Sequence, residues 1–235
     1  MRPAALIFDK DGTLFDFHAT WGGWSRGLIE AEAGGDAALA RRIAEALGYD
    51  MAAGRFSPDS IVIAATAGEI ADRMLPLLPG GDRAAVIARM NARSAKAPQV
   101  PAVPLGPLFA DLAARRLALG LVTNDSEAPA RAHLHASGLS ARFGFVAGAD
   151  SGHGAKPGPG QLVACAAAFG LAPAACAMIG DSLHDLHAAR AAGMTAIAVL
   201  TGLAARDSLA PHADLVLDHI GALPDWLDEQ GITKP

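Results

Sequence analysis

Two aspartates near the start of the chain, Asp9 and Asp11, have the residue type and spacing of a reactive carboxylate pair. They follow the short apolar run 4–8, which is typical of a buried parallel strand, and they precede Gly12 and Thr13. Ligands of open α/β sheets bind at the carboxyl ends of the strands, so the pair is expected at a binding cleft. Adjacent carboxylates repel each other unless a cation relieves the repulsion, and Mg²⁺ suits an oxygen-only site. The pattern predicts a magnesium site, although a bare D-x-D is equally typical of a turn or a helix cap.

Five later residues have side chains that suit phosphate and metal binding. Thr123 and Asn124 end an apolar run before a helical segment, where a hydroxyl and free N–H groups can bind phosphate oxygens. Lys156 stands in a proline-rich loop and can neutralise a phosphoryl group as a compact charge. Asp181 ends another apolar run, and Asp185 follows it by one helical turn on the same face. Taken singly, each of these residues is also typical of a helix cap or a solvated loop.

Strands and helices alternate from about residue 105 onward, and this alternation must position the polar residues. The predicted strands are 4–8, 117–122, 143–147, 176–179, 195–200 and 215–217. The predicted helices are 108–116, 127–137, 161–169, 183–192 and 220–227. Such alternation predicts an α/β fold in which a parallel sheet carries helices on both faces.

The segment between the first strand and this region has helical periodicity instead. Its predicted helices are 25–33, 36–47, 67–78 and 82–95, with Asp36 and Asp82 as N-caps. We therefore expect two domains: an α/β core formed by 1–15 and 100–235, and a small all-helical insertion formed by 16–99.

The segment Asp9-Lys10-Asp11-Gly12-Thr13-Leu14 resembles the first motif of the haloacid dehalogenase superfamily of aspartate-nucleophile phosphohydrolases. Thr123 resembles the second motif, and Lys156 resembles the third in its K-P-x-P form. Asp181 and Asp185 resemble the fourth, G-D-x-x-x-D, so that the four motifs occur in order. The resemblance implies a Rossmann-like core with a helical cap inserted after the first strand. Among capped members, the arrangement looks most like the phosphoglycolate phosphatases and their relatives.

The resemblance also implies a mechanism. Asp9 would attack phosphorus and form an aspartyl-phosphate. Asp11 would protonate the leaving oxygen and then deprotonate the hydrolytic water. Mg²⁺ would be held by Asp9, by the backbone carbonyl of Asp11 and by Asp181. The phosphoryl oxygens would be held by Thr123, the Asn124 backbone and Lys156, while Asp185 would bind a metal-bound water or orient Lys156.

Composition limits the possible partners. The 235 residues are 51% hydrophobic and 18% charged, which indicates a globular protein, and the formal net charge of −5 argues against a nucleic-acid or anionic-membrane surface. No signal peptide or membrane span is recognised, so we expect a cytoplasmic protein, a monomer or a homodimer, acting on a small phosphorylated molecule.

The predicted function is magnesium-dependent hydrolysis of a small, phosphoglycolate-like phosphomonoester. Arg26, Arg55 or Arg73 could meet a carboxylate of such a substrate. Two alternatives remain: a phosphosugar mutase, which would retain the same core residues, and a catalytically silent binding module on this fold.

Overall fold

A six-stranded sheet forms the centre of the protein in this computed structural model, which describes residues 2–234. Its strands are β1 (Ala5–Phe8), β4 (Ala118–Val122), β5 (Phe145–Ala147), β6 (Cys176–Gly180), β7 (Thr195–Val199) and β8 (Leu215–Leu217). All neighbouring strands pair in parallel, in the order β5-β4-β1-β6-β7-β8. The chain builds one half of the sheet outward from β1 and then crosses to the other half, so β1 lies at the switch point where ligands bind in such sheets.

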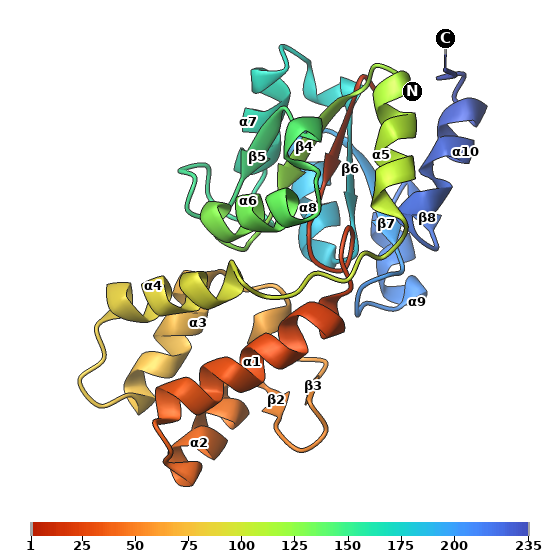
Figure 1. Cartoon of the computed structure of the whole chain (residues 1–235). Helices are drawn as coiled ribbons and strands as arrows, with labels where there is room; N and C mark the ends of the chain where they lie inside the picture. The colour runs from red at the N-terminus through yellow and green to blue at the C-terminus, as the bar shows by residue number, and fades with distance from the viewer. Residues whose placement is uncertain (1, 235) are drawn as a thin grey trace.

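Helices cover both faces of the sheet (Figure 1). On one face, Leu6 and Phe8 of β1 pack in a core shared with α5 (Leu105–Ala114), α6 (Glu127–Ala136) and α10 (Leu223–Glu229). On the other face, Ala5 and Ile7 share a core with α7 (Gly160–Ala168), α8 (Leu183–Ala192) and α9 (Arg206–Leu209). Alternate residues of a strand point to opposite faces, so this strand is apolar throughout. The predicted fold class is confirmed.

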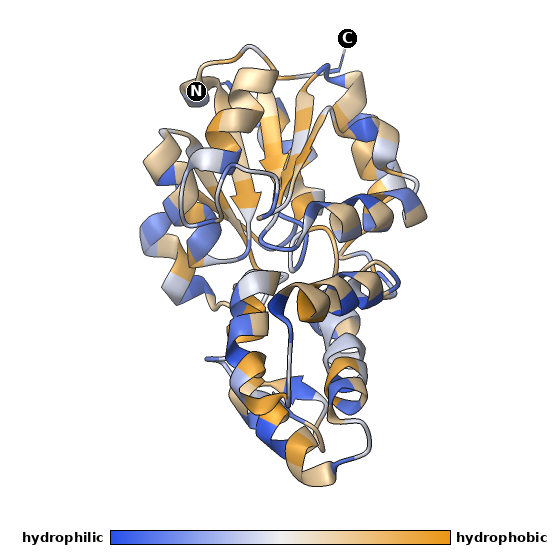
Figure 2. Ribbon diagram, turned by 90° about the vertical axis from the view of Figure 1, so that its left-hand side faces the viewer, coloured by the Kyte–Doolittle hydropathy of each residue, from blue (hydrophilic) through white to orange (hydrophobic). Residues whose placement is uncertain are grey.

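A second group of helices, which we call the cap, lies beyond the carboxyl ends of the strands (Figure 1). Its helices are α1 (Phe17–Ala33), α2 (Ala37–Leu47), α3 (Ala67–Met74) and α4 (Arg83–Ser94), and it has a hydrophobic core of its own. The two chain segments that join it to the sheet run side by side, because Asp16 N donates a hydrogen bond of 2.8 Å to Val100 O. In Figure 2 hydrophobic and hydrophilic residues alternate along the cap helices.

The cap differs in detail from the prediction. Its first helix begins at Phe17 instead of residue 25, because Asp16 caps it and Trp21, Trp24 and Leu28 are all buried along it. Hydrophobic burial outweighs the poor helix propensity of its two central glycines. The cap also contains a short ladder that was not predicted, formed by β2 (Tyr49–Asp50) and β3 (Arg55–Phe56).

Short 3₁₀ helices complete the described part of the chain. They are η1 (Ile61–Ile63), η2 (Leu75–Leu77), η3 (Ser140–Arg142), η4 (Pro173–Ala175), η5 (Ala210–His212) and η6 (Ile220–Ala222). The helix predicted for 67–78 ends at Met74 and continues as η2, where Pro76 cannot donate a helical hydrogen bond. Within residues 2–234, no helix has the length and apolar character needed to cross a membrane.

Candidate active site

The predicted site residues of three strands meet at one edge of the sheet. Asp9 and Asp11 follow β1, Thr123 and Asn124 follow β4, and Asp181 follows β6. Because β1 lies between β4 and β6, the ends of the three strands are adjacent. Residues more than 100 positions apart in the chain therefore line one space.

Lys156 forms two ion pairs at this edge. Its Nζ lies 2.6 Å from Asp9 Oδ1 and 2.6 Å from Asp185 Oδ1, and it also donates to Val122 O at 3.2 Å. Burial alone would lower the pKa of Lys156, but Asp185 and Asp9 outweigh it and raise the pKa above the usual value. The ammonium thus stays charged beside the carboxylate that is predicted to be the nucleophile.

Asp185 is fixed by its position in the first turn of α8. Its Oδ2 accepts hydrogen bonds from Ser182 N at 3.1 Å and Ser182 Oγ at 2.7 Å, which is a capping-box arrangement. The N-cap of α8 is therefore Ser182 and not Asp181, whereas Asp185 lies in the first turn and also pairs with Lys156. Oδ2 of Asp185 accepts the hydrogen bonds from Ser182 at the start of the helix, and Oδ1 forms the ion pair with Lys156.

Three buried carboxylates form an acidic cluster. Oxygen atoms of Asp9, Asp181 and Asp185 lie within 4.8 Å of one another. Burial raises the pKa of Asp9 to about 7, although Lys156 acts in the opposite direction. Burial, with the nearby Asp185 and Asp9, also raises the pKa of Asp181 well above its usual value. A single lysine does not neutralise three carboxylates, so the cluster has excess negative charge. Its residues therefore fit a divalent cation that prefers oxygen ligands.

Lys10 organises the surroundings of Asp11, and the sequence analysis did not identify this role. Its side chain is fully buried, with Nζ at 2.9 Å from Asp11 Oδ2 and 3.0 Å from Asp125 Oδ2. It also lies 3.0 Å from Nδ1 of His133, whose Nε2 is 2.7 Å from Ser94 O in the cap. A lysine donates only, so Nδ1 accepts and Nε2 donates its hydrogen to the carbonyl. The cluster fixes Asp11 and joins the cap to the core.

Asn124 and Thr123 have structural contacts beside their predicted role. The Asn124 side chain pairs with the backbone of Lys156, accepting from its N and donating to its O, both at 2.9 Å. It also donates to Ala64 O of the cap at 2.8 Å. Thr123 Oγ1 accepts from Asp125 N at 3.1 Å. Asn124 thus ties the lysine loop to β4, and phosphate binding by this pair stays a prediction.

The loop after β7 is a second feature that the sequence analysis missed. Thr201 Oγ1 donates to Gly12 O at 2.6 Å. A Cβ on Gly202 would lie 1.6 Å from Asp181 Oδ2, so only glycine leaves room for the carboxylate. The sequence signals this contact only by a glycine after a predicted strand. Most loops that follow the predicted strands contain a glycine, so this signal does not single out Gly202.

A cavity between the cap and the core contains the site. It encloses about 700 Å³, solvent at its mouth included, and Asp9, Asp11, Asp181 and Lys156 lie along its core side. Among the described residues, no arginine lines it. Arg55 and Arg73 are exposed, and Arg26 donates to the backbone oxygen of Met51. The expectation that one of these arginines meets the substrate is therefore not supported by the cavity.

The comparisons with known proteins agree with this geometry. The chain belongs to the haloacid dehalogenase-like hydrolases, because the model of that family matches residues 3–193. It is 32% identical over 233 residues to the phosphoglycolate phosphatase of Rhodospirillum rubrum, an alignment that covers 96% of this chain and 91% of the relative. The predicted membership of this superfamily and the predicted hydrolase class are confirmed.

Solved structures show the same fold. A predicted phosphoglycolate phosphatase from Haemophilus somnus 129PT has a TM-score of 0.74 at 18% identity, with 96% of this chain and 98% of that chain covered. The β-phosphoglucomutase from Clostridium difficile has a TM-score of 0.67 at 19% identity, with coverages of 98% and 97%. At these identities the likeness concerns the fold alone.

Proposed function

We propose that the chain is a magnesium-dependent phosphatase that hydrolyses a small phosphomonoester through an aspartyl-phosphate. The observation that carries the proposal is the placement of Asp9: its carboxylate lies 2.6 Å from Lys156 Nζ, within the acidic cluster and on the wall of a cavity. A carboxylate at this position can attack phosphorus while Lys156 offsets the negative charge of the phosphoryl oxygens.

In the first step, an Asp9 oxygen forms a bond to phosphorus and the ester P–O bond breaks. Asp11 gives its proton to the leaving oxygen and is fixed for this by Lys10, at 2.9 Å. In the second step, Asp11 takes a proton from water, whose oxygen attacks phosphorus and releases phosphate from Asp9. Both half-reactions need the same carboxyl group in opposite protonation states.

The residues proposed to hold Mg²⁺ are Asp9 and Asp181 through their carboxylates, and Asp11 through its backbone carbonyl. When bound, the ion would supply Lewis-acid stabilisation of the charge that develops on the phosphoryl oxygens. Asp185 would keep Lys156 in place through its ion pair of 2.6 Å. We further propose that residues 16–99 act as a cap on the core domain formed by 1–15 and 100–235, and that this cap excludes water from the active site.

The phosphosugar mutase is the enzymatic alternative, since the β-phosphoglucomutase structure shares this fold. A sugar leaving group needs polar partners, but most of the cap residues along the cavity are apolar. This composition supports the phosphatase over the mutase. The buried acidic cluster and its lysine count against a silent binding module, because burying several charges without a chemical use is costly.

The test is phosphate release with and without Mg²⁺ from methyl phosphate, benzyl phosphate, sugar phosphates and 2-phosphoglycolate, the last suggested by the names of the relatives. Asp9→Asn should reduce turnover by at least about 10⁴-fold, a loss of the size seen when a nucleophile is removed. Asp207→Asn, an exposed carboxylate on α9, is the matched control and should retain full activity. Full activity of Asp9→Asn would refute the nucleophile, and isomerisation of a sugar phosphate would favour the mutase.

A further inference from the structure

Most of the cap side chains that line the cavity are apolar. We call them the cap wall. Six buried side chains form most of it, from α1, η1, α3 and α4: Phe17, Trp21, Trp24, Val62, Ile70 and Met90. The two indole rings pack edge to face, with centroids 4.9 Å apart. The polar groups that the cap side chains contribute include Asn91 and Ser94 of α4 and the indole N–H of Trp24, whose Nε1 is buried without a hydrogen-bond partner among the described residues. None of the three carries a charge.

Positive charge in the cavity lies at its core end. Of the described lining residues, Lys156 and His184 are the basic ones, and both come from the core. Lys156 already pairs with two carboxylates. His184 is in the first turn of α8, beside the acidic cluster and not on the cap wall.

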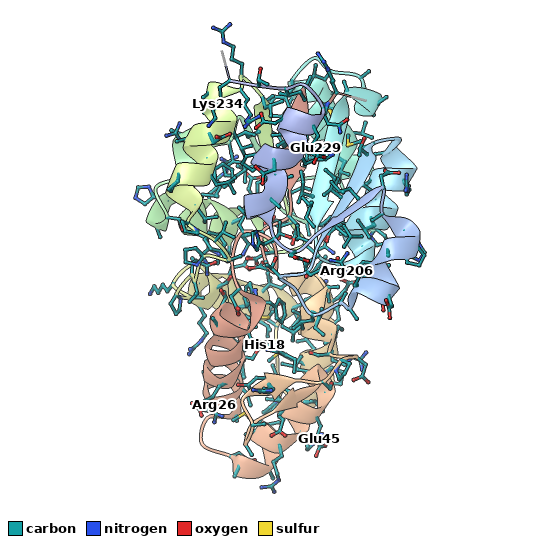
Figure 3. All side chains as sticks on the ribbon, turned by 90° about the vertical axis from the view of Figure 1, so that its right-hand side faces the viewer. His18, Arg26, Glu45, Arg206, Glu229 and Lys234 are labelled. Atoms are coloured by element: carbon teal, nitrogen blue, oxygen red, sulfur yellow. The ribbon has the colours of Figure 1, made fainter. Side chains whose placement is uncertain are left out.

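No arginine or lysine of the cap is among the described residues that line the cavity. Figure 3 shows Arg26 on the cap further from the core than His18, and its guanidinium donates to the backbone of Met51. Lys10 Nζ lies 5.1 Å from the Trp21 ring centroid, but Lys10 is fully buried, is paired with Asp11 and Asp125, and does not line the cavity. A carboxylate on the leaving group would therefore meet the cap wall without a cationic partner.

We propose that the leaving group of the substrate is an uncharged, largely apolar alcohol, of the arylmethyl or branched-alkyl class, and not a carboxylate-bearing one such as glycolate. This inference rests on the proposed phosphatase activity, since it names the substrate class of the same site. Desolvating an unpaired carboxylate is costly, whereas apolar surface gains from burial against the cap wall. The acidic side chains at the core end add repulsion against a second anionic group.

The first experiment compares kcat/KM for benzyl phosphate and 2-phosphoglycolate, both esters of primary alcohols. We expect benzyl phosphate to be favoured by at least about 100-fold, a discrimination within the range of a pocket that fits one group and leaves the other unpaired. Equal values, or a preference for 2-phosphoglycolate, would overturn the inference.

Two isoleucines of the cap supply matched variants. Ile70 lines the cavity, whereas Ile43 is buried in the same cap core and does not line it. Ile70→Ala should lower the ratio of kcat/KM for benzyl phosphate to that for methyl phosphate by about tenfold. Ile43→Ala removes the same atoms from the cap core and should leave this ratio unchanged. A similar fall in both variants would show that cap stability, not contact with the leaving group, sets the preference.

A binding measurement separates this inference from the proposed activity. In the presence of Mg²⁺, calorimetry would compare 2-phenylethylphosphonate with 3-phosphonopropionate, which replace the bridging oxygens of the two esters by carbon. Tighter binding of the phenylethyl compound supports the apolar site, even if no ester is hydrolysed and the phosphatase proposal fails. Tighter binding of 3-phosphonopropionate by a protein that does hydrolyse esters would overturn the inference and leave the phosphatase intact.

Discussion

Replacing Gly202 by alanine tests the metal site through a residue that is neither ligand nor nucleophile. The added Cβ would lie 1.6 Å from Asp181 Oδ2 and 2.3 Å from its Cγ. An ordinary contact needs at least 3.4 Å, so the oxygen must move by about 1.8 Å if the loop stays in place. The hydrogen bond from Thr201 to Gly12 O, 2.6 Å long, opposes retreat of the loop.

Such a displacement is large for a magnesium ligand. Mg²⁺ requires near-ideal octahedral geometry at about 2.0–2.1 Å, with a tolerance of about 0.2 Å. We therefore expect Gly202→Ala to weaken the apparent affinity for Mg²⁺ by about 10- to 100-fold, as loss of a supporting contact of a metal ligand does. In free energy this is about 1.4–2.7 kcal/mol.

The assay is a Mg²⁺ titration of phosphate release, together with the metal-induced rise in Tm as a readout that needs no turnover. Gly106→Ala in α5 is the matched control, because a Cβ there would meet nothing within 4 Å. That variant should bind Mg²⁺ like the wild type. An unchanged Mg²⁺ affinity in Gly202→Ala, with the fold intact, would refute the assignment of Asp181 as a ligand.

Two further predictions concern the buried charges. Burial raises the pKa of Asp9 to about 7 and also raises the pKa of Asp181. Without the ion, the folded chain therefore keeps protons that the unfolded chain loses from about pH 4 upward, so the ion-free protein becomes less stable as the pH rises from about 4 to 7. Mg²⁺ must displace these protons in order to bind. The rise in Tm caused by Mg²⁺ should therefore be larger at pH 8 than at pH 6, and a rise that is equal or smaller at pH 8 would contradict this account. Lys10→Met would leave the carboxylates of Asp11 and Asp125 without their buried cation. We expect the free energy of unfolding, measured in urea, to fall by about 3 kcal/mol, whereas Lys96→Met at an exposed position should change it little. A loss below about 1 kcal/mol in Lys10→Met would show that the cluster is not structurally important.

Much of the core was predictable because its signals are local. The strand 176–179 and the helix 183–192 appear as β6 (Cys176–Gly180) and α8 (Leu183–Ala192). Apolar runs and helical periodicity depend on neighbours a few positions away, which the sequence displays directly. The start of α1 was missed because burial of Trp21 and Trp24 in the cap core outweighs the glycines between them, and no local pattern measures that burial.

The sequence by itself determined the order of the strands along the chain and the polar residues at their ends, from Asp9 to Asp185. Parallel strands carry their carboxyl ends to one edge, so this information was enough to predict a phosphate and metal site. The tertiary structure alone decided that Lys10 meets Asp125 and His133, more than 100 positions away, and that Gly202 packs on Asp181. It also decided that the arginines of the cap lie outside the cavity. These contacts depend on strand order and on how the cap sits over the core, and neither is encoded within a few neighbouring residues.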